Sequence, residues 1–118
     1  YRYPPQPYEK MPLFINASDL VYSPVVKKIL NFATPLKIAE ALSCGVPVVA
    51  TDIPEYKLWY RQGVYTYRNY EELERVLSWV MNDVKELRKN LRVYSDSFRE
   101  RFSWDRLAQE YELVLEMV

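Results

Sequence analysis

Two charged side chains near the start of one predicted helix are the residues best suited to chemistry in this sequence. The helix is expected to begin at Thr34, whose side chain can cap it, with Pro35 at the first helical position. Lys37 and Glu40 are three residues apart, so they share a face of this helix. Because a helix N-terminus offers free N–H groups and positive potential, a phosphate is expected beside Thr34 and Lys37. The Glu40 carboxylate would then accept hydrogen bonds from a diol such as a ribose.

The same residues also have an ordinary structural explanation. At this spacing Lys37 and Glu40 are typical of a solvated helical ion pair, and spacing alone favours that interpretation. Thr34 and Pro35 are common helix-start residues, and Gly45 is a common stop in the left-handed conformation. The residue pattern by itself therefore leaves both a binding site and a solvated helix open.

Three short apolar runs predict the strands that would hold this helix in place. They cover residues 20–22, 46–51 and 64–67, and turn-forming residues bound each of them. Strands that alternate with helices imply right-handed crossovers and an α/β layered architecture around a short parallel sheet. In such sheets ligands bind outside the carboxyl ends of the strands. The strand at 20–22 is expected to need a further neighbour, from the N-terminal segment, from a second chain or from strands further upstream.

Capping residues predict the remaining helices. Asn69 with Glu72 forms a capping-box pattern ahead of an apolar helix face, and Asp83 with Glu86 repeats the pattern and predicts a separate helix. Ser103 is expected to cap a last helix that also buries one face.

The N-terminal segment has its own composition. Residues 1–12 contain four prolines and three tyrosines, which favours an extended chain held down by aromatic packing.

Composition limits the classes of function. The chain has 118 residues, which predicts a single domain over 1–118, and 16 basic and 16 acidic residues leave no net charge to attract nucleic acid or an anionic membrane. One cysteine and no histidine argue against a disulfide or a zinc site and favour a cytoplasmic location. No apolar run predicts a transmembrane segment. Because the sequence begins at Tyr1 without a methionine, we expect an excised or processed part of a longer protein.

Several stretches resemble one enzyme family in their order and spacing. ASDLVYSP at 17–24, TPLKIAEALSCGVPVVATDIPE at 34–55, Gly63, and FSWD at 102–105 with Tyr111 are similar to the second half of the C-terminal domain of GT4-family glycosyltransferases. The resemblance covers nearly the whole chain, and residues 34–55 are its most specific part. It implies a GT-B fold, in which two Rossmann-like domains face a cleft. The C-terminal domain holds most of the nucleotide-sugar donor, and this mode of binding needs no metal.

The resemblance also implies roles for individual residues. Glu40 matches the second glutamate of the family's paired-glutamate motif, which binds the ribose hydroxyls of the donor. Residues 35–40 are similar to a Pro-x-Lys-x-x-Glu version of this motif, in which Lys37 would be a phosphate partner. The side chain of Thr34 and the backbone amide of Leu36 would then lie beside the diphosphate. Pro35 completes the substrate-binding set.

The family pattern and this sequence differ at one motif position. Phe32 stands where the first glutamate would fall, so the contact of that glutamate with the donor sugar does not carry over from the family to this sequence. The full-length parent is expected to be a hexosyltransferase-type enzyme. The chain alone is expected to be inactive, because the family's cations for the diphosphate and its acceptor site would precede Tyr1.

The expected partners follow from this interpretation. They are a nucleoside diphosphate sugar and either the missing N-terminal part of the enzyme or a second copy of the chain. Two alternatives remain open: a non-catalytic nucleotide-binding module, and a protein-interaction module in which the exposed strand edge pairs with another chain.

Overall fold

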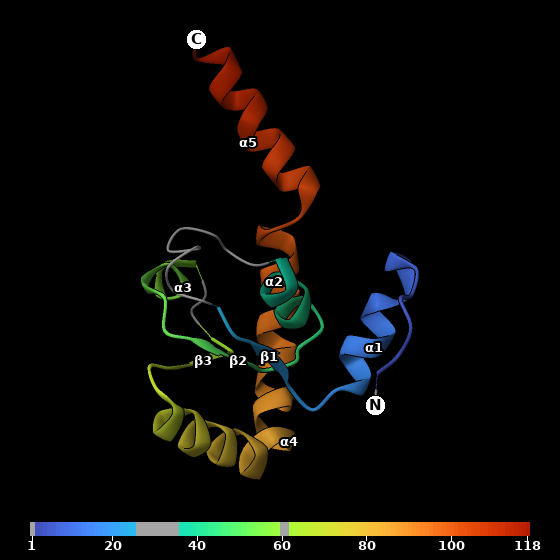
Figure 1. The fold of residues 1–118 in the computed structure, drawn as a ribbon. Coiled ribbons are helices and arrows are strands. Elements are labelled where there is room, and N and C mark those ends of the chain that lie inside the picture. Colours follow the sequence, from blue (N-terminus) through green and yellow to red (C-terminus); the bar gives the residue numbers. More distant parts are fainter. Residues whose placement is uncertain (1, 26–35, 60–61) are drawn as a thin grey trace.

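A short parallel sheet lies between helices in the computed structural model (Figure 1). The structure describes residues 2–25, 36–59 and 62–118. The elements in chain order are η1 (Tyr8–Lys10), α1 (Met11–Ala17), β1 (Val21–Ser23), α2 (Leu36–Ser43), β2 (Val48–Thr51), α3 (Pro54–Trp59), β3 (Val64–Tyr67), α4 (Tyr70–Arg101) and α5 (Trp104–Glu116).

The sheet confirms the α/β architecture predicted from the sequence. Its strand order is β1-β2-β3, both pairings are parallel, and Val21, Val48 and Val64 lie in register across it. All four residues of β2 are buried, as expected for a central parallel strand that is covered on both faces. The protein is therefore a partial Rossmann-like unit with C-terminal helices. β1 lies at one edge of the sheet, where the sequence predicted a strand in need of a neighbour.

Helices cover the two faces of the sheet with different apolar surfaces. On one face, the core cluster joins Val48 and Ala50 of β2 to three fully buried residues of α2, Ile38, Ala41 and Leu42. On the other face, the ring of Tyr65 in β3 meets Trp79 of α4 edge-on, with centroids 5.1 Å apart. α4 contributes side chains on both faces of the sheet, because its ribbon changes direction along its length (Figure 1).

The continuity of α4 corrects one prediction. The prediction of a separate helix starting at Asp83 is wrong, because α4 runs unbroken from Tyr70 to Arg101. An aspartate caps a helix only where the following N–H groups lack carbonyl partners, and inside α4 those partners exist. The other predicted start is confirmed, since the Asn69 side chain accepts a 2.9 Å hydrogen bond from the backbone N–H of Glu72. The Glu72 carboxylate, however, accepts from Arg68.

The last helix, α5, is more exposed than the sequence predicted. Ser103 caps it as expected, accepting from the backbone N–H of Arg106 at 3.2 Å. The prediction that this helix buries one face is wrong, because none of its residues is buried and Tyr111 is 72% exposed. In Figure 1 α5 extends away from the body of the protein. An amphipathic helix buries its apolar side only where another element lies beside it, and the described part of the chain supplies none for α5.

Both glycines are needed where the chain enters the left-handed region. Gly45 has φ +68° and its N–H donates to the carbonyl of Leu42 at 3.0 Å, which confirms the predicted stop of α2. Gly63 has φ +86° just before β3, and a Cβ built there would come within 2.7 Å of side-chain carbons of Leu42 and Leu91. At Gly45 the nearest such neighbour is 3.6 Å away, in Arg92.

This difference predicts unequal effects of two matched substitutions. Gly45→Ala should destabilise the fold by about 1–2 kcal/mol, the cost of a left-handed backbone with a Cβ. Gly63→Ala should cost about 1–3 kcal/mol more, because its methyl group would also overpack the contact between α2 and α4. Urea denaturation of the two variants measures the difference, and equal losses would contradict the proposed steric contribution.

Candidate functional site

Glu40 of α2 has a defined hydrogen-bond partner from the N-terminal segment. The Tyr8 hydroxyl donates to Glu40 Oε1 at 2.6 Å, although the two residues are 32 positions apart in the sequence. This hydrogen bond raises the pKa of Tyr8, and repulsion between a phenolate and the nearby carboxylate adds to the increase. The contact directs the Glu40 side chain toward η1.

A groove lies beside this contact. It has a volume of about 460 Å³, and residues of η1, α1, α2 and the region where α4 meets α5 line it. Its walls are mainly apolar, with Ile15, Leu36 and Phe102 among them, and Tyr8 and Glu40 supply polar atoms. This size and this mixture of apolar walls with a few polar groups are typical of small-molecule sites, which range from roughly 300 to 1,000 Å³.

Two arginines of α4 hold the helices on either side of the groove. Arg88 donates to the carbonyls of Asn16 and Ser18 at the end of α1, at 3.0 and 2.7 Å. Arg99 donates to the carbonyl of Ser43 at the end of α2, at 3.2 Å. The last carbonyls of a helix lack partners within it and carry partial negative charge, so a guanidinium is well matched to them. The groove is thus bounded by two helices tied to a third.

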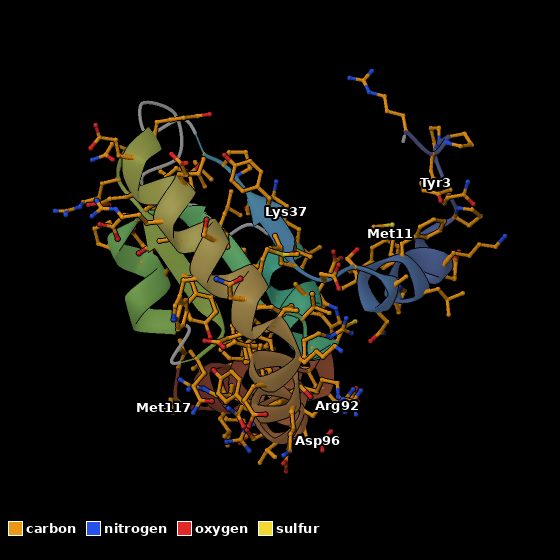
Figure 2. The ribbon with its side chains drawn as sticks, turned by 90° about the horizontal axis from the view of Figure 1, so that it is seen from below. Tyr3, Met11, Lys37, Arg92, Asp96 and Met117 are labelled. Atoms are coloured by element: carbon orange, nitrogen blue, oxygen red, sulfur yellow. The ribbon has the colours of Figure 1, made fainter. Side chains whose placement is uncertain are left out.

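Lys37 and Glu40 do not share the groove. The side chain of Lys37 is exposed and does not line it. In Figure 2, Lys37 lies on the main body of the protein, whereas Met11 lies to one side with α1. Residues three apart are neighbours on a helix surface, so the spacing permits an ion pair between Lys37 and Glu40 without requiring one. Among the ion pairs of the described residues none joins Lys37 to Glu40, so the solvated pair suggested by their spacing does not form.

The remaining predicted site residues are divided between described and undescribed positions. Leu36 is 60% exposed and lies at the end of the groove formed by the start of α2. Thr34 and Pro35 lie outside the described residues, as does Phe32. The predicted cap at Thr34 therefore stays a prediction.

The comparisons with known proteins identify the family. A family model described as glycosyl transferase-like matches residues 1–112, a span that includes Tyr8, Glu40 and most of α5. The chain belongs to this glycosyl transferase-like family. No curated protein and no solved structure matches it significantly.

In this glycosyl transferase-like protein the groove and the carboxyl ends of the strands are distinct places. Ser23, Thr51 and Tyr67 end the three strands, and none of them lines the groove. Glu40 instead lies on the side of α2 away from the buried Ile38. The sequence placed the whole site at the strand ends. The structure places the carboxylate beside α2, in a groove that extends along the helix from Leu36.

The strand ends contain polar groups of their own. Thr51 Oγ1 accepts a 2.9 Å hydrogen bond from the backbone N–H of Val25, and the hydroxyls of Tyr22 and Tyr67 are 2.8 Å apart. Ser23 is fully buried, and its Oγ has no hydrogen-bond partner among the described residues.

Cys44 also lines the groove, where it behaves as a small apolar residue. Burial raises the pKa of its thiol, while the nearby Arg99 and Glu40 act in opposite directions. A raised pKa keeps the thiol protonated near neutral pH, and a protonated thiol is a poor nucleophile.

The described residues of this family member contain neither a metal-binding cluster nor a membrane-spanning helix. In that part of the chain, no three histidine, cysteine, aspartate or glutamate side chains gather as a metal site would require. None of the helices described is long and apolar enough to span a bilayer.

Sequence reasoning missed Tyr8. The proline-rich segment predicted aromatic packing, and Tyr3 does contact Phe14 with ring centroids 5.5 Å apart. Tyr8 instead uses its hydroxyl, and its partner lies in another element. The local sequence holds no signal for that pairing, because it depends on how α1 packs beside α2.

The Tyr8–Glu40 contact predicts a specific titration. Glu40→Gln removes the carboxylate, so the pKa of Tyr8 should fall back toward its ordinary value. Glu9→Gln, which neutralises an exposed carboxylate adjacent to Tyr8 in the sequence, should leave that pKa in place. NMR titration of ¹³C-labelled tyrosine, assigned with Tyr8→Phe, measures both.

The raised pKa of Tyr8 also predicts how the stability of the fold changes with pH. Because folding raises the pKa of Tyr8, the contact stabilises the protein while the phenol is protonated, and this contribution is lost as the pH rises through the raised value, above about 10. A Tyr8 pKa unaffected by Glu40→Gln would contradict the hydrogen bond.

Proposed function

We propose that this chain is the nucleotide-binding part of a GT4-type glycosyltransferase with GT-B architecture. It binds the nucleoside diphosphate portion of a nucleotide-sugar donor. The main supporting observation is the groove of about 460 Å³ with Glu40 among its lining residues, in a chain of the glycosyl transferase-like family.

The nucleoside part of the donor would lie along α2. The base would contact the apolar walls, such as Phe102, and the ribose hydroxyls would donate to the Glu40 carboxylate. Hydrogen bonds to a charged group contribute about 1.5–3 kcal/mol each, so Glu40 would supply a large part of the affinity.

The diphosphate would lie toward the start of α2. There Lys37, the backbone amide of Leu36 and the side chain of Thr34 would supply positive potential and N–H donors, with Pro35 setting the backbone. These groups would bind the diphosphate without a metal ion.

Transfer itself would require more than this chain. The parent would be a hexosyltransferase-type enzyme in the cytoplasm, and catalysis would need cations that stabilise the departing diphosphate and an acceptor site. We therefore propose that the isolated chain binds the nucleotide but does not transfer sugar. The edge of β1 would meet the rest of the enzyme or a second copy of the chain.

A protein-interaction module derived from the same fold is the second candidate. It is favoured by α5, which has no buried residue and exposes Trp104, Tyr111 and Leu115. Exposed apolar side chains concentrated on one element mark surfaces that meet other proteins. This candidate predicts no affinity for nucleotides.

Calorimetry distinguishes the two candidates. UDP, GDP and ADP would each be titrated into the unaltered chain, into Glu40→Ala and into Glu86→Ala, which removes an exposed carboxylate from α4. We expect at least one nucleotide to bind, Glu40→Ala to weaken it about tenfold or more, and Glu86→Ala to leave it unchanged.

Two other outcomes would contradict the proposed nucleotide site. Binding that is insensitive to Glu40→Ala would remove Glu40 from the site. Absence of heat with all three nucleotides would favour the interaction module.

A further inference from the structure

The Tyr8–Glu40 contact suggests a role for Tyr8 that rests on the proposed nucleotide site. Both residues line the groove, and their hydrogen bond at 2.6 Å is in the range of about 2.5–2.7 Å found when a hydroxyl donates to a carboxylate. We propose that Tyr8 is a positioning residue for Glu40: its hydroxyl holds the carboxylate in the orientation that accepts the ribose diol of a ribonucleotide.

The hydrogen bond leaves room for the ribose. A carboxylate has about four acceptor positions on its two oxygens, and Tyr8 occupies one of them, on Oε1. No other donor among the described residues is hydrogen-bonded to the Glu40 carboxylate, so Oε2 and the second position on Oε1 remain for the two hydroxyls of a ribose. Tyr8 and the ribose are therefore compatible partners of one carboxylate.

Tyr8 is itself held in place. It begins η1, where Lys10 N–H donates to the carbonyl of Pro7 at 3.0 Å, and the fixed φ of the neighbouring proline restricts the backbone. α1 follows directly, and Arg88 ties the end of α1 to α4. The backbone of Tyr8 is thus held by its neighbours, although the Tyr8 side chain is mostly exposed.

The position of Glu40 explains why such support is useful. Its side chain is only half-buried, and glutamate has several rotatable bonds, so without a partner it would sample many orientations. A carboxylate oriented before the ligand arrives gives up less conformational freedom on binding. Tyr8 therefore adds affinity for the diol without being required to touch the nucleotide.

The experiment uses the tightest-binding of UDP, GDP and ADP and its 2′-deoxy counterpart. Calorimetry would be run on the unaltered chain, Tyr8→Phe, Glu40→Ala and the double variant. Tyr8→Phe should weaken the ribonucleotide about three- to tenfold and the deoxynucleotide much less. In the Glu40→Ala background the same change should have no effect, because Tyr8 acts through the carboxylate.

Tyr3→Phe is the matched control. Tyr3 lies in the same N-terminal segment and is 72% exposed, so its hydroxyl should be dispensable for binding. Urea denaturation of Tyr8→Phe would show whether the fold is retained. A folding defect would weaken both nucleotides equally and would persist in the Glu40→Ala background.

The two proposals fail in different ways. If the unaltered chain binds and Glu40→Ala weakens binding while Tyr8→Phe does not, Tyr8 has no positioning role and the nucleotide site stands. Equal loss for both nucleotides, or tighter binding by Tyr8→Phe, would also overturn the role of Tyr8. If the unaltered chain binds no nucleotide, both proposals fall.

Discussion

The central strand β2 imposes the constraint on which the rest of the structure depends. Its four residues, Val48–Thr51, are all buried, so both faces of a small sheet must be covered by apolar side chains from helices. α2 covers one face, and the ring contact between Tyr65 and Trp79 places α4 on the other. Because α4 is long and changes direction, its later part returns to α2. One helix thereby joins both layers of the fold.

The return of α4 also shapes the candidate site. It brings Arg88 to the end of α1 and Arg99 to the end of α2, and these two guanidinium groups fix the helices that flank the groove. α1 in turn fixes η1, from which Tyr8 reaches the carboxylate of Glu40. The position of a single carboxylate therefore depends on contacts with three separate elements, and such a scaffold fixes a side chain more accurately than a free side chain could be fixed.

Membership of the glycosyl transferase-like family and the geometry of α2 support one another. The family match spans residues 1–112, and the structure places within that span a mainly apolar groove with the half-buried carboxylate of Glu40 in its lining. The exposed α5 and the edge of β1 have a different character, because α5 presents apolar side chains and β1 pairs with β2 alone among the described strands. The proposal of protein contacts rests on these surfaces, and the proposal of a nucleotide site rests on the groove.

Short-range features of this protein were determined by the sequence itself. The caps at Asn69 and Ser103 and the stop at Gly45 were predictable because each depends on residues within one helical turn. The parallel strands followed from apolar runs bounded by turn formers, and Glu40 stood out through its motif. Tertiary structure alone decided that Asp83 lies inside a helix, that α5 is exposed, and that Tyr8 donates to Glu40. Each of these depends on packing between elements distant in the chain, and local propensity holds no information about such packing.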